Sequence, residues 1–253
     1  MVIMESVHDI SQIGIGYFRD IDRFTEIYYP GQDSESVLKL IEKSPGIDFR
    51  YFCFRYLDEI RKFELPKLEQ DLSKEAVIVE FRSLPHLEFV LRNAIRKLGD
   101  NWSFTVVCGN HNYDFMSAMV RSMGVDIKLI RYDLDNIDQN SYSSLLSEKS
   151  FWDRLIGEKI LIFQEDSCIF KCNIDDFMEW DYVGAPWALQ QNTNKLLVGN
   201  GGLSLRTKSV MLKTISRIGI KNTSYNSSTV EFMRKRELTV PPEDVYFSKN
   251  IID

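Results

Sequence analysis

The chain has 253 residues, and its 31 lysines and arginines against 37 aspartates and glutamates give a formal net charge of −6. Hydrophobic residues make up 44% and charged residues 27%, a balance that is typical of globular proteins and excludes disordered, collagen-like and coiled-coil classes. An acidic chain offers no positively charged surface for a polyphosphate backbone, so we expect no nucleic-acid partner.

No stretch of the sequence approaches the roughly 18 to 20 consecutive apolar residues of a membrane-spanning helix, so we expect no transmembrane segment. The first residues lack a basic region followed by an apolar one, as a signal peptide would have. The four cysteines show no CxxC spacing and fit reduced thiols better than a disulfide framework. These features predict a cytoplasmic protein.

The region 1–74 differs from the rest of the chain, because its aromatic residues are dense, scattered and interleaved with charges. It shows no clear alternation of apolar and polar residues. The segment 49–65 has Phe52, Tyr56, Ile60 and Phe63 at helical spacing, which predicts an amphipathic helix that ends before Pro66. We interpret residues 1–74 as an accessory region that packs on the main fold.

A regular alternation of strands and helices begins at Ala76. The β-branched run 76–81 predicts a buried strand, 86–98 predicts a helix closed by Gly99, and 104–108 predicts a second strand. The helical segment 115–123, closed by Gly124, then leads to a strand over 127–132. Such βαβ units predict an α/β fold with a mostly parallel central sheet in a main domain over residues 75–253.

The later segments continue this pattern with shorter elements. A helix is expected over 151–156 and a buried strand over 159–163, and 182–187 and 198–205 read as short strands with tight turns. Helices are expected near 210–218 and 245–251.

The first candidate site follows the predicted strand 159–163. Glu165, Asp166 and Ser167 interrupt an apolar run there, and ligands of parallel α/β sheets bind beyond the carboxyl ends of the strands. Adjacent carboxylates that are buried without partners are costly, so this site is wet, paired with a cation or loaded with a metal. Hard oxygen ligands suit Mg²⁺ or Mn²⁺. The alternative is a turn whose acids cap the next segment.

Three further motifs carry candidate site residues. Glu80 and Arg82 flank Phe81 at the end of the first regular strand and form either a surface ion pair or a ligand contact. The segment 199–202, Gly-Asn-Gly-Gly, is either a hairpin turn or a loop that lets backbone approach a ligand closely. Glu243 and Asp244 follow two prolines, where they either stabilise a helix N-terminus or face a pocket as a general base.

Other kinds of chemistry find little support in the sequence. It contains no GxxxxGK[ST] phosphate loop, no HExxH zinc motif and no GxSxG nucleophile elbow. Trp180 and Trp187 flank a short apolar segment, where core packing is the first interpretation and sugar stacking the second.

Five segments of the chain, taken in order, resemble a little-characterised family of glycosyltransferases with the GT-A type fold. The resemblance runs from about Ala76 to the C-terminus and leaves out residues 1 to about 74. Its motifs are 80–93, 151–167, 181–187, 199–206 and 243–247.

The resemblance implies a nucleotide-sugar-binding α/β sandwich in which an Asp-x-Asp-like motif holds Mn²⁺ or Mg²⁺ on the donor diphosphate. In this sequence that motif departs from the family pattern, because either a serine or a glutamine stands at one acidic position. The implied metal ligands are Asp166, Glu165 and Ser167, the implied donor-binding residues are Glu80, Arg82, Gly109, Glu165 and Asp166, and the implied acceptor side is Trp187, Gly201 and Gly202. The late acidic motif implies a catalytic base, with Asp244 preferred to Glu243.

The hypothesis from the sequence is therefore transfer of a sugar from a nucleoside diphosphate-sugar to the hydroxyl of a glycan or another acceptor. Whether the transfer inverts or retains the anomeric configuration is left open. The alternative is a catalytically inactive nucleotide- or glycan-binding module of the same fold, because one expected acid is replaced.

Overall fold

The structure is a computed structural model that describes residues 20–69, 73–187 and 198–251. The chain divides into two compact units. The first consists of Met1–Glu64 and Pro85–Leu91, and the second of Leu65–Leu84 and Arg92–Asp253. The packing of an accessory region 1–74 on a main domain 75–253 stays a prediction.

The first unit is helical in its described part. Asp33 caps the N-terminus of α2 by accepting a hydrogen bond of 2.8 Å from the backbone N–H of Ser36, and Pro45 starts α3, where its missing N–H costs nothing. The helices are 20–28, α2 (Ser34–Lys43), α3 (Pro45–Arg55) and α4 (Leu57–Arg61). They enclose a small core of Ile21, Phe24, Val37, Ile41 and Tyr51.

The prediction of a single helix over 49–65 is wrong. The helix is interrupted at Tyr56, which ends α3 and precedes α4. Of the expected stripe only Ile60 is buried, whereas Phe52, Tyr56 and Phe63 are exposed. Because of this interruption α4 has its own buried face, which is formed by Leu57 and Ile60.

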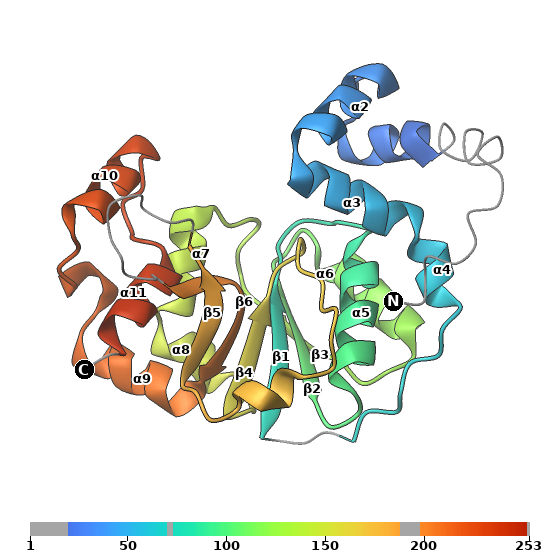
Figure 1. Ribbon diagram of the computed structural model, residues 1–253. Helices are drawn as coiled ribbons and strands as arrows, with labels where there is room; N and C mark the ends of the chain where they lie inside the picture. The colour runs from blue at the N-terminus through green and yellow to red at the C-terminus, as the bar shows by residue number, and fades with distance from the viewer. Residues whose placement is uncertain (1–19, 70–72, 188–197, 252–253) are drawn as a thin grey trace. The chain divides into compact units, whose positions relative to one another are not determined.

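The second unit is built on a six-stranded sheet (Figure 1). The strand order is β3-β2-β1-β4-β6-β5; β1 to β4 are parallel, and β6 is antiparallel to both β4 and β5. The strands are β1 (Lys74–Val79), β2 (Ser103–Cys108), β3 (Lys128–Arg131), β4 (Lys159–Phe163), β5 (Tyr182–Pro186) and β6 (Val198–Thr207). The predicted α/β class and mostly parallel central sheet are confirmed.

The helices alternate with these strands. Gly124 closes α6 with φ of 68°, the left-handed conformation that glycine adopts without strain. The helices are α5 (Leu87–Leu98), which starts in a segment of the first unit, α6 (Tyr113–Met123), α7 (Gln139–Leu146), α8 (Lys149–Asp153), α9 (Lys208–Arg217), α10 (Ser227–Lys235) and α11 (Glu243–Asn250), with 3₁₀ turns η1 (Ile174–Phe177) and η2 (Ile220–Asn222). Among the described residues, no helix has both the length and the apolar character to cross a membrane.

The glycine-rich segment 199–202 lies inside strand β6, so its interpretation as a hairpin turn is wrong. β6 runs from Val198 to Thr207 and pairs with β4 on one side and β5 on the other, with register shifts next to Ala185. Within the glycine-rich segment, Asn200 pairs with Ala185 of β5, and the carbonyl oxygen of Gly202 accepts the N–H of Gln164 at 3.0 Å. These contacts stabilise an extended conformation that the local Asn-Gly signal does not favour.

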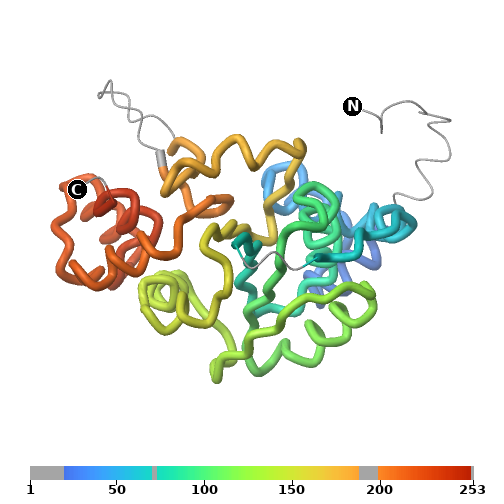
Figure 2. Tube along the Cα trace, turned by 90° about the horizontal axis from the view of Figure 1, so that it is seen from below, coloured from blue at the N-terminus to red at the C-terminus, as the bar shows by residue number. Residues whose placement is uncertain are grey.

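The parallel strands gather their carboxyl ends at one edge of the sheet. β1 ends just before Glu80 and β4 just before Gln164, and these two strands are neighbours. After β4 the chain leaves the sheet through η1 before it returns as β5 (Figure 2). The residues that follow β1 and β4 therefore meet β6 beside them, and the candidate site lies there.

Candidate active site

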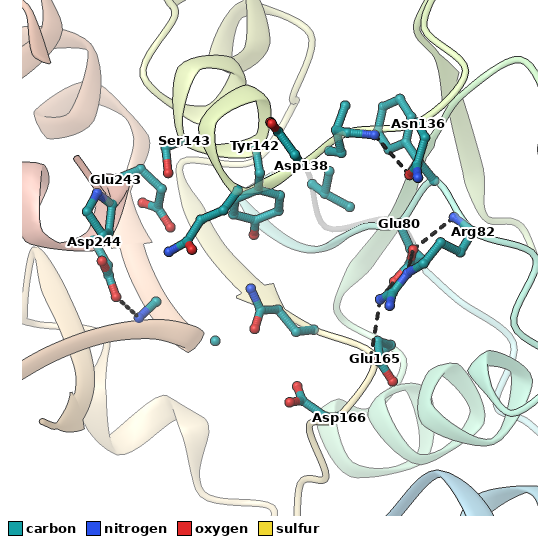
Figure 3. Close-up of a pocket in the computed structure, with 18 of the residues that line it drawn as sticks. Glu80, Arg82, Asn136, Asp138, Tyr142, Ser143, Glu165, Asp166, Glu243 and Asp244 are labelled. Carbon is teal, nitrogen blue, oxygen red and sulfur yellow. Dashed lines mark hydrogen bonds and ion pairs between the residues drawn. The ribbon is translucent and has the colours of Figure 1, made fainter. Parts of the chain in front are cut away.

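A pocket of about 430 Å³ lies at this edge of the sheet, entirely within the second unit. Five separate segments line it: the end of β1, the end of β4, the glycine-rich part of β6, the start of α7 with the residues before it, and the start of α11. The acids lie in two groups on opposite sides, with Glu243 and Asp244 on one and Glu80 and Glu165 on the other (Figure 3). Eight of the predicted site residues line the pocket: Glu80, Arg82, Glu165, Asp166, Gly201, Gly202, Glu243 and Asp244.

The first acidic group is organised around Arg82. Its guanidinium donates two hydrogen bonds to the carboxylate of Glu80, of 2.8 and 2.7 Å, and one of 3.3 Å to Glu165. Glu80 also accepts the backbone N–H of Arg82 at 2.8 Å. The hydrogen bonds to Glu80 raise the pKa of the Arg82 guanidinium, although partial burial opposes this. One arginine thus holds two carboxylates in place and keeps its charge.

Asn112 fixes the backbone that carries this group. Its side-chain amide donates to the carbonyl oxygens of Glu80 at 2.9 Å and Arg82 at 3.2 Å, and its carbonyl accepts the N–H of Gly109 at 2.9 Å. The loop after β2 is thereby tied to the end of β1.

Asp166 and Ser167 follow β4 but face different surroundings. Asp166 lines the pocket with an exposed side chain. Ser167 does not line it, because its hydroxyl donates to the carbonyl of Gly202 at 2.9 Å and accepts the N–H of Gln164 at 3.2 Å. Ser167 therefore holds the turn against β6, and its place among metal ligands stays a prediction.

The second acidic group contains a buried ion pair. Glu243 receives two hydrogen bonds from Arg206, of 2.5 and 3.1 Å, and both side chains are almost fully buried. Burial, the largest single effect, lowers the pKa of the Arg206 guanidinium, but the charge and hydrogen bonds of Glu243, together with Tyr182 and Tyr142, raise this pKa overall. Burial also raises the pKa of the Glu243 carboxyl, against the effect of Arg206.

Gly201 lies directly over this ion pair. A Cβ atom at position 201 would come within 2.7 Å of Glu243 Oε1, 2.8 Å of Arg206 Nη2 and 2.9 Å of the Asp244 Cβ. The N–H of Gly201 donates to Asp244 Oδ2 at 3.0 Å. A side chain at this position would push β6 away from α11, so the glycine is needed for close approach.

Asp244 stands at the start of α11. Its Oδ1 accepts a hydrogen bond of 2.7 Å from the N–H of Val245, and its Oδ2 accepts one from the N–H of Gly201. Each carboxylate oxygen retains a second lone pair. Of the two predicted bases, Glu243 is paired with Arg206, whereas Asp244 forms no ion pair with an arginine in the described part of the chain.

Besides Ser167, two further predicted site residues lie outside the pocket. Gly109 packs against the ring of Phe81 and the backbone of Leu134, where a Cβ would clash with both. Trp187 follows β5, and a Cβ at Gly199 would come within 3.2 Å of its ring. The roles of Gly109 in donor binding and of Trp187 on the acceptor side stay predictions.

The structure adds a wall of uncharged residues that the sequence reasoning missed. Asp138 caps α7 by accepting the N–H of Ser141 at 2.7 Å, a pattern that can be recognised in sequence as a helix start. The uncharged lining residues of α7 and the segment before it are Asn136, Ile137, Gln139, Tyr142 and Ser143. Gln164 and Asn200, which also line the pocket, lie within the motifs after β4 and in β6. No local signal marks the residues of 136–143 as pocket-forming, because they lie far in sequence from the motifs that they meet.

The chain offers only part of a metal site. Among the described residues, no cluster of three or more histidine, cysteine, aspartate or glutamate side chains is arranged to hold a metal ion. Asp166 and Glu165 are adjacent carboxylates, and Glu165 is already paired with Arg82. Mg²⁺ is often bound by one or two carboxylates together with substrate phosphates, and the residues present fit that kind of shared site.

The charge of the pocket favours a cation. Its described lining contains six acids, Glu80, Asp138, Glu165, Asp166, Glu243 and Asp244, and a single cationic side chain, Arg82. Even with Arg206 behind the surface, the acids are in excess. A doubly negative diphosphate would be repelled unless it arrives with a cation.

The class of protein that this architecture defines is an α/β protein with an acidic pocket at the carboxyl ends of a mostly parallel sheet. Residues 126–253, half of the chain, match the model of the family described as Protein of unknown function (DUF5672). The chain belongs to this family. We found no relative among curated proteins.

Several solved structures are similar to the chain at low identity. Glycosyltransferase GlyE of Streptococcus pneumoniae TIGR4 is 11% identical over 72% of this chain and 44% of GlyE, with a TM-score of 0.45. Mannosyltransferase PcManGT of Pyrobaculum calidifontis, in complex with GDP-Man and Mn²⁺, is 10% identical over 71% of this chain and 57% of that one, with a TM-score of 0.40. The inositol-1-phosphate CTP transferase of T. maritima is 12% identical over 72% and 97%, with a TM-score of 0.40.

The chain spans less than half of the length of GlyE. At these identities and TM-scores, the likenesses do not bear on what the chain binds or catalyses.

Proposed function

We propose that the protein transfers a sugar from a nucleoside diphosphate-sugar to an acceptor hydroxyl, in the pocket described above. The observation that carries this proposal is that four motifs, far apart in sequence, converge on one pocket. They contribute Glu80 with Arg82, Glu165 with Asp166, Gly201 with Gly202, and Glu243 with Asp244. These motifs are also among those by which the sequence resembles glycosyltransferases.

In the proposed reaction the acceptor oxygen attacks the anomeric carbon of the donor sugar. A new C–O bond forms, the bond from the anomeric carbon to the diphosphate oxygen breaks, and the nucleoside diphosphate leaves with the electron pair. In an inverting transfer the acceptor proton passes to Asp244, whose carboxylate lines the pocket and forms no ion pair with an arginine among the residues that the structure describes. The backbone N–H groups of Gly201 and Val245 hold that carboxylate in place.

The donor diphosphate would lie near Asp166 and Glu165, which would share a Mn²⁺ or Mg²⁺ ion with it. The ion offsets negative charge on the departing diphosphate when it is bound. Arg82 contributes a fixed positive charge on the same side and orients Glu165. In this proposal the side of the pocket formed by the residues after β1 and β4 binds the diphosphate, and the side near α11 provides the base.

A specific observation also favours the alternative, an inactive binding module. Both candidate bases have structural partners: Glu243 is paired with Arg206, and Asp244 accepts two backbone N–H groups. Such carboxylates can be retained for folding alone. Binding without transfer would then be the function of the pocket.

The test is a thermal-shift panel of UDP-glucose, GDP-mannose, CDP-glucose and dTDP-glucose with and without Mn²⁺, followed by measurement of nucleotide release. The proposal predicts that at least one donor stabilises the protein in a Mn²⁺-dependent manner and that nucleotide is then released, slowly without acceptor. Stabilisation with no release favours the inactive module. If none of the donors shifts the melting temperature at millimolar concentration, both sugar transfer and the nucleotide-binding form of the inactive module are wrong.

A further inference from the structure

Tyr142 stands out among the residues that line the pocket. It lies on α7 between the two acidic groups (Figure 3), and its ring packs against the main core of the second unit. Its hydroxyl oxygen is buried close to the Gln164 side chain, yet it forms no hydrogen bond of normal geometry with any residue that the structure describes. Buried polar groups nearly always have a partner, so this one requires an explanation.

The hydroxyl cannot easily turn away to find a partner elsewhere. α7 is capped by Asp138, and the side chain of Asn140 accepts the N–H groups of Thr239 at 2.9 Å and Val240 at 3.0 Å. These bonds tie α7 to the segment that leads into α11. These bonds hold the helix, and the packing of the Tyr142 ring against the core limits the movement of the phenol relative to the second acidic group.

The surroundings of the hydroxyl determine what it can bind. Glu243, Asp244 and Arg206 all act on it electrostatically, and burial, followed by the charge of Glu243, raises the pKa of Tyr142. The phenol therefore keeps its proton and can donate it in a hydrogen bond. Two carboxylates on this side disfavour an anion such as phosphate, whereas a neutral hydroxyl can accept from Tyr142 and donate to a carboxylate oxygen.

We propose that Tyr142 is a specificity-determining residue that donates a hydrogen bond to a hydroxyl group of the donor sugar. This inference rests on the proposed function, because the ligand is the sugar of a nucleoside diphosphate-sugar. It adds that the wall formed by α7 recognises the sugar rather than the diphosphate or the base. A site that is built to bond a substrate hydroxyl discriminates against ligands that lack it.

The first test compares two kinds of ligand in the Tyr142→Phe variant. Affinities for UDP-glucose, GDP-mannose and dTDP-glucose, and for UDP, GDP and dTDP, are measured by titration calorimetry with Mn²⁺. We expect the nucleotide sugar that binds the wild type to lose about tenfold in affinity in the variant, the size of one neutral hydrogen bond, while its bare nucleoside diphosphate changes less than about twofold. An equal loss for both ligands, or no loss, overturns the inference.

The second test is a double-mutant cycle with monodeoxy analogues of the bound sugar. If Tyr142 bonds one sugar hydroxyl, one analogue binds the wild type about tenfold more weakly, and the Tyr142→Phe variant does not discriminate against it. If, for every analogue, the loss of affinity from the missing sugar hydroxyl and the loss from Tyr142→Phe simply multiply, Tyr142 forms no direct hydrogen bond with a sugar hydroxyl.

Tyr132→Phe is the matched control. The hydroxyl of Tyr132 is also buried without a hydrogen bond to a described residue, but it lies outside the pocket. We expect this variant to bind all ligands as the wild type does. Because Tyr142→Phe removes a hydroxyl without a protein partner, its melting temperature should not fall; a clear fall means that the hydroxyl has a structural role and overturns the inference.

Failure of the inference differs from failure of the proposed function. A wild type that binds neither nucleotide sugars nor nucleoside diphosphates contradicts the proposed function and the inference with it. A wild type that binds a nucleotide sugar, with an unchanged affinity in Tyr142→Phe, contradicts the inference alone.

Discussion

Arg206 and Glu243 form an ion pair through two hydrogen bonds of 2.5 and 3.1 Å, with side chains that are 0% and 5% exposed. Arg206 comes from β6 and Glu243 from the first turn of α11, so the pair joins the sheet to the C-terminal helix. Gly201 covers it on the pocket side. Glu243 thereby has a structural role, and Asp244 is left as the carboxylate available for chemistry.

We predict that Glu243→Gln destabilises the protein by about 3 to 5 kcal/mol, because it leaves the charge of Arg206 buried without a counter-charge. The measurement is the free energy of unfolding in urea. Asp153→Asn, which breaks an exposed ion pair with Lys149, is the control and should change it little. Equal effects of the two substitutions would mean that the buried pair is not a special source of stability.

Gly201→Ala should destabilise the protein by about 1 to 3 kcal/mol, because the added methyl group would lie within 2.7 to 2.9 Å of three atoms. Gly219→Ala is a suitable comparison, since the nearest atom there is at an ordinary 3.7 Å. Urea unfolding of both variants checks this. A Gly201→Ala protein as stable as Gly219→Ala would show that β6 and α11 can separate without cost.

Asp166→Asn should lower the Mn²⁺ affinity of the donor complex at least tenfold, because the variant removes the exposed carboxylate beside the proposed diphosphate site. Mn²⁺ titration in the presence of a stabilising nucleotide sugar measures this. Asp176→Asn, an exposed acid in η1 outside the pocket, should leave the titration unchanged. An unaltered Mn²⁺ affinity in Asp166→Asn removes this residue from the metal site.

Asp244→Asn should reduce turnover by about a hundredfold or more while donor affinity stays close to that of the wild type, because an amide cannot take a proton from the acceptor. Steady-state kinetics with the donor identified by the panel, alongside the melting temperature, separates loss of the base from loss of fold. A variant that turns over at a near-normal rate excludes Asp244 as the base.

Tyr246 supplies a prediction for alkaline pH. Its hydroxyl donates to the carbonyl of Ile218 at 2.6 Å, and burial raises the pKa of Tyr246 to about 12. The folded state therefore keeps the proton at a pH where the unfolded chain, with a tyrosine pKa of about 10, releases it. The stability due to Tyr246 is complete below about pH 10 and is lost as the pH rises toward 12.

The wild type should consequently be more stable than Tyr246→Phe at pH 9, and the difference should shrink by pH 11. Unfolding free energies of both proteins across this range provide the check. A constant difference would show that Tyr246 titrates normally in the folded state.

Much of the second unit could be predicted from local patterns. The β-branched run that precedes Glu80 and the apolar stripe closed by Gly99 are statements about neighbouring residues, and they correspond to β1 and α5. The acids after β4 could be assigned to a ligand-binding edge, because parallel strands gather their carboxyl ends. Asp166 and Glu165 indeed line the pocket.

The rest depends on contacts between distant segments. The partner of Glu243 lies 37 residues away, and that of Glu165 lies 83 residues away. Nothing near Gly201 in sequence shows that the segment belongs to a strand beside β5, and nothing near Tyr142 shows that it faces a pocket. These features are set by contacts that form only when distant segments of the chain come together in the folded state.

The central claim is that one nucleotide sugar fills the pocket, with its diphosphate beside Asp166 and its sugar toward Tyr142 and Asp244. A crystal soaked with the donor that gives the largest thermal shift and with Mn²⁺, measured at a wavelength where manganese scatters anomalously, tests it most directly. We predict an anomalous peak next to the Asp166 carboxylate and sugar density between Tyr142 and Asp244. A manganese peak away from Asp166, or donor density outside this pocket, would contradict the account.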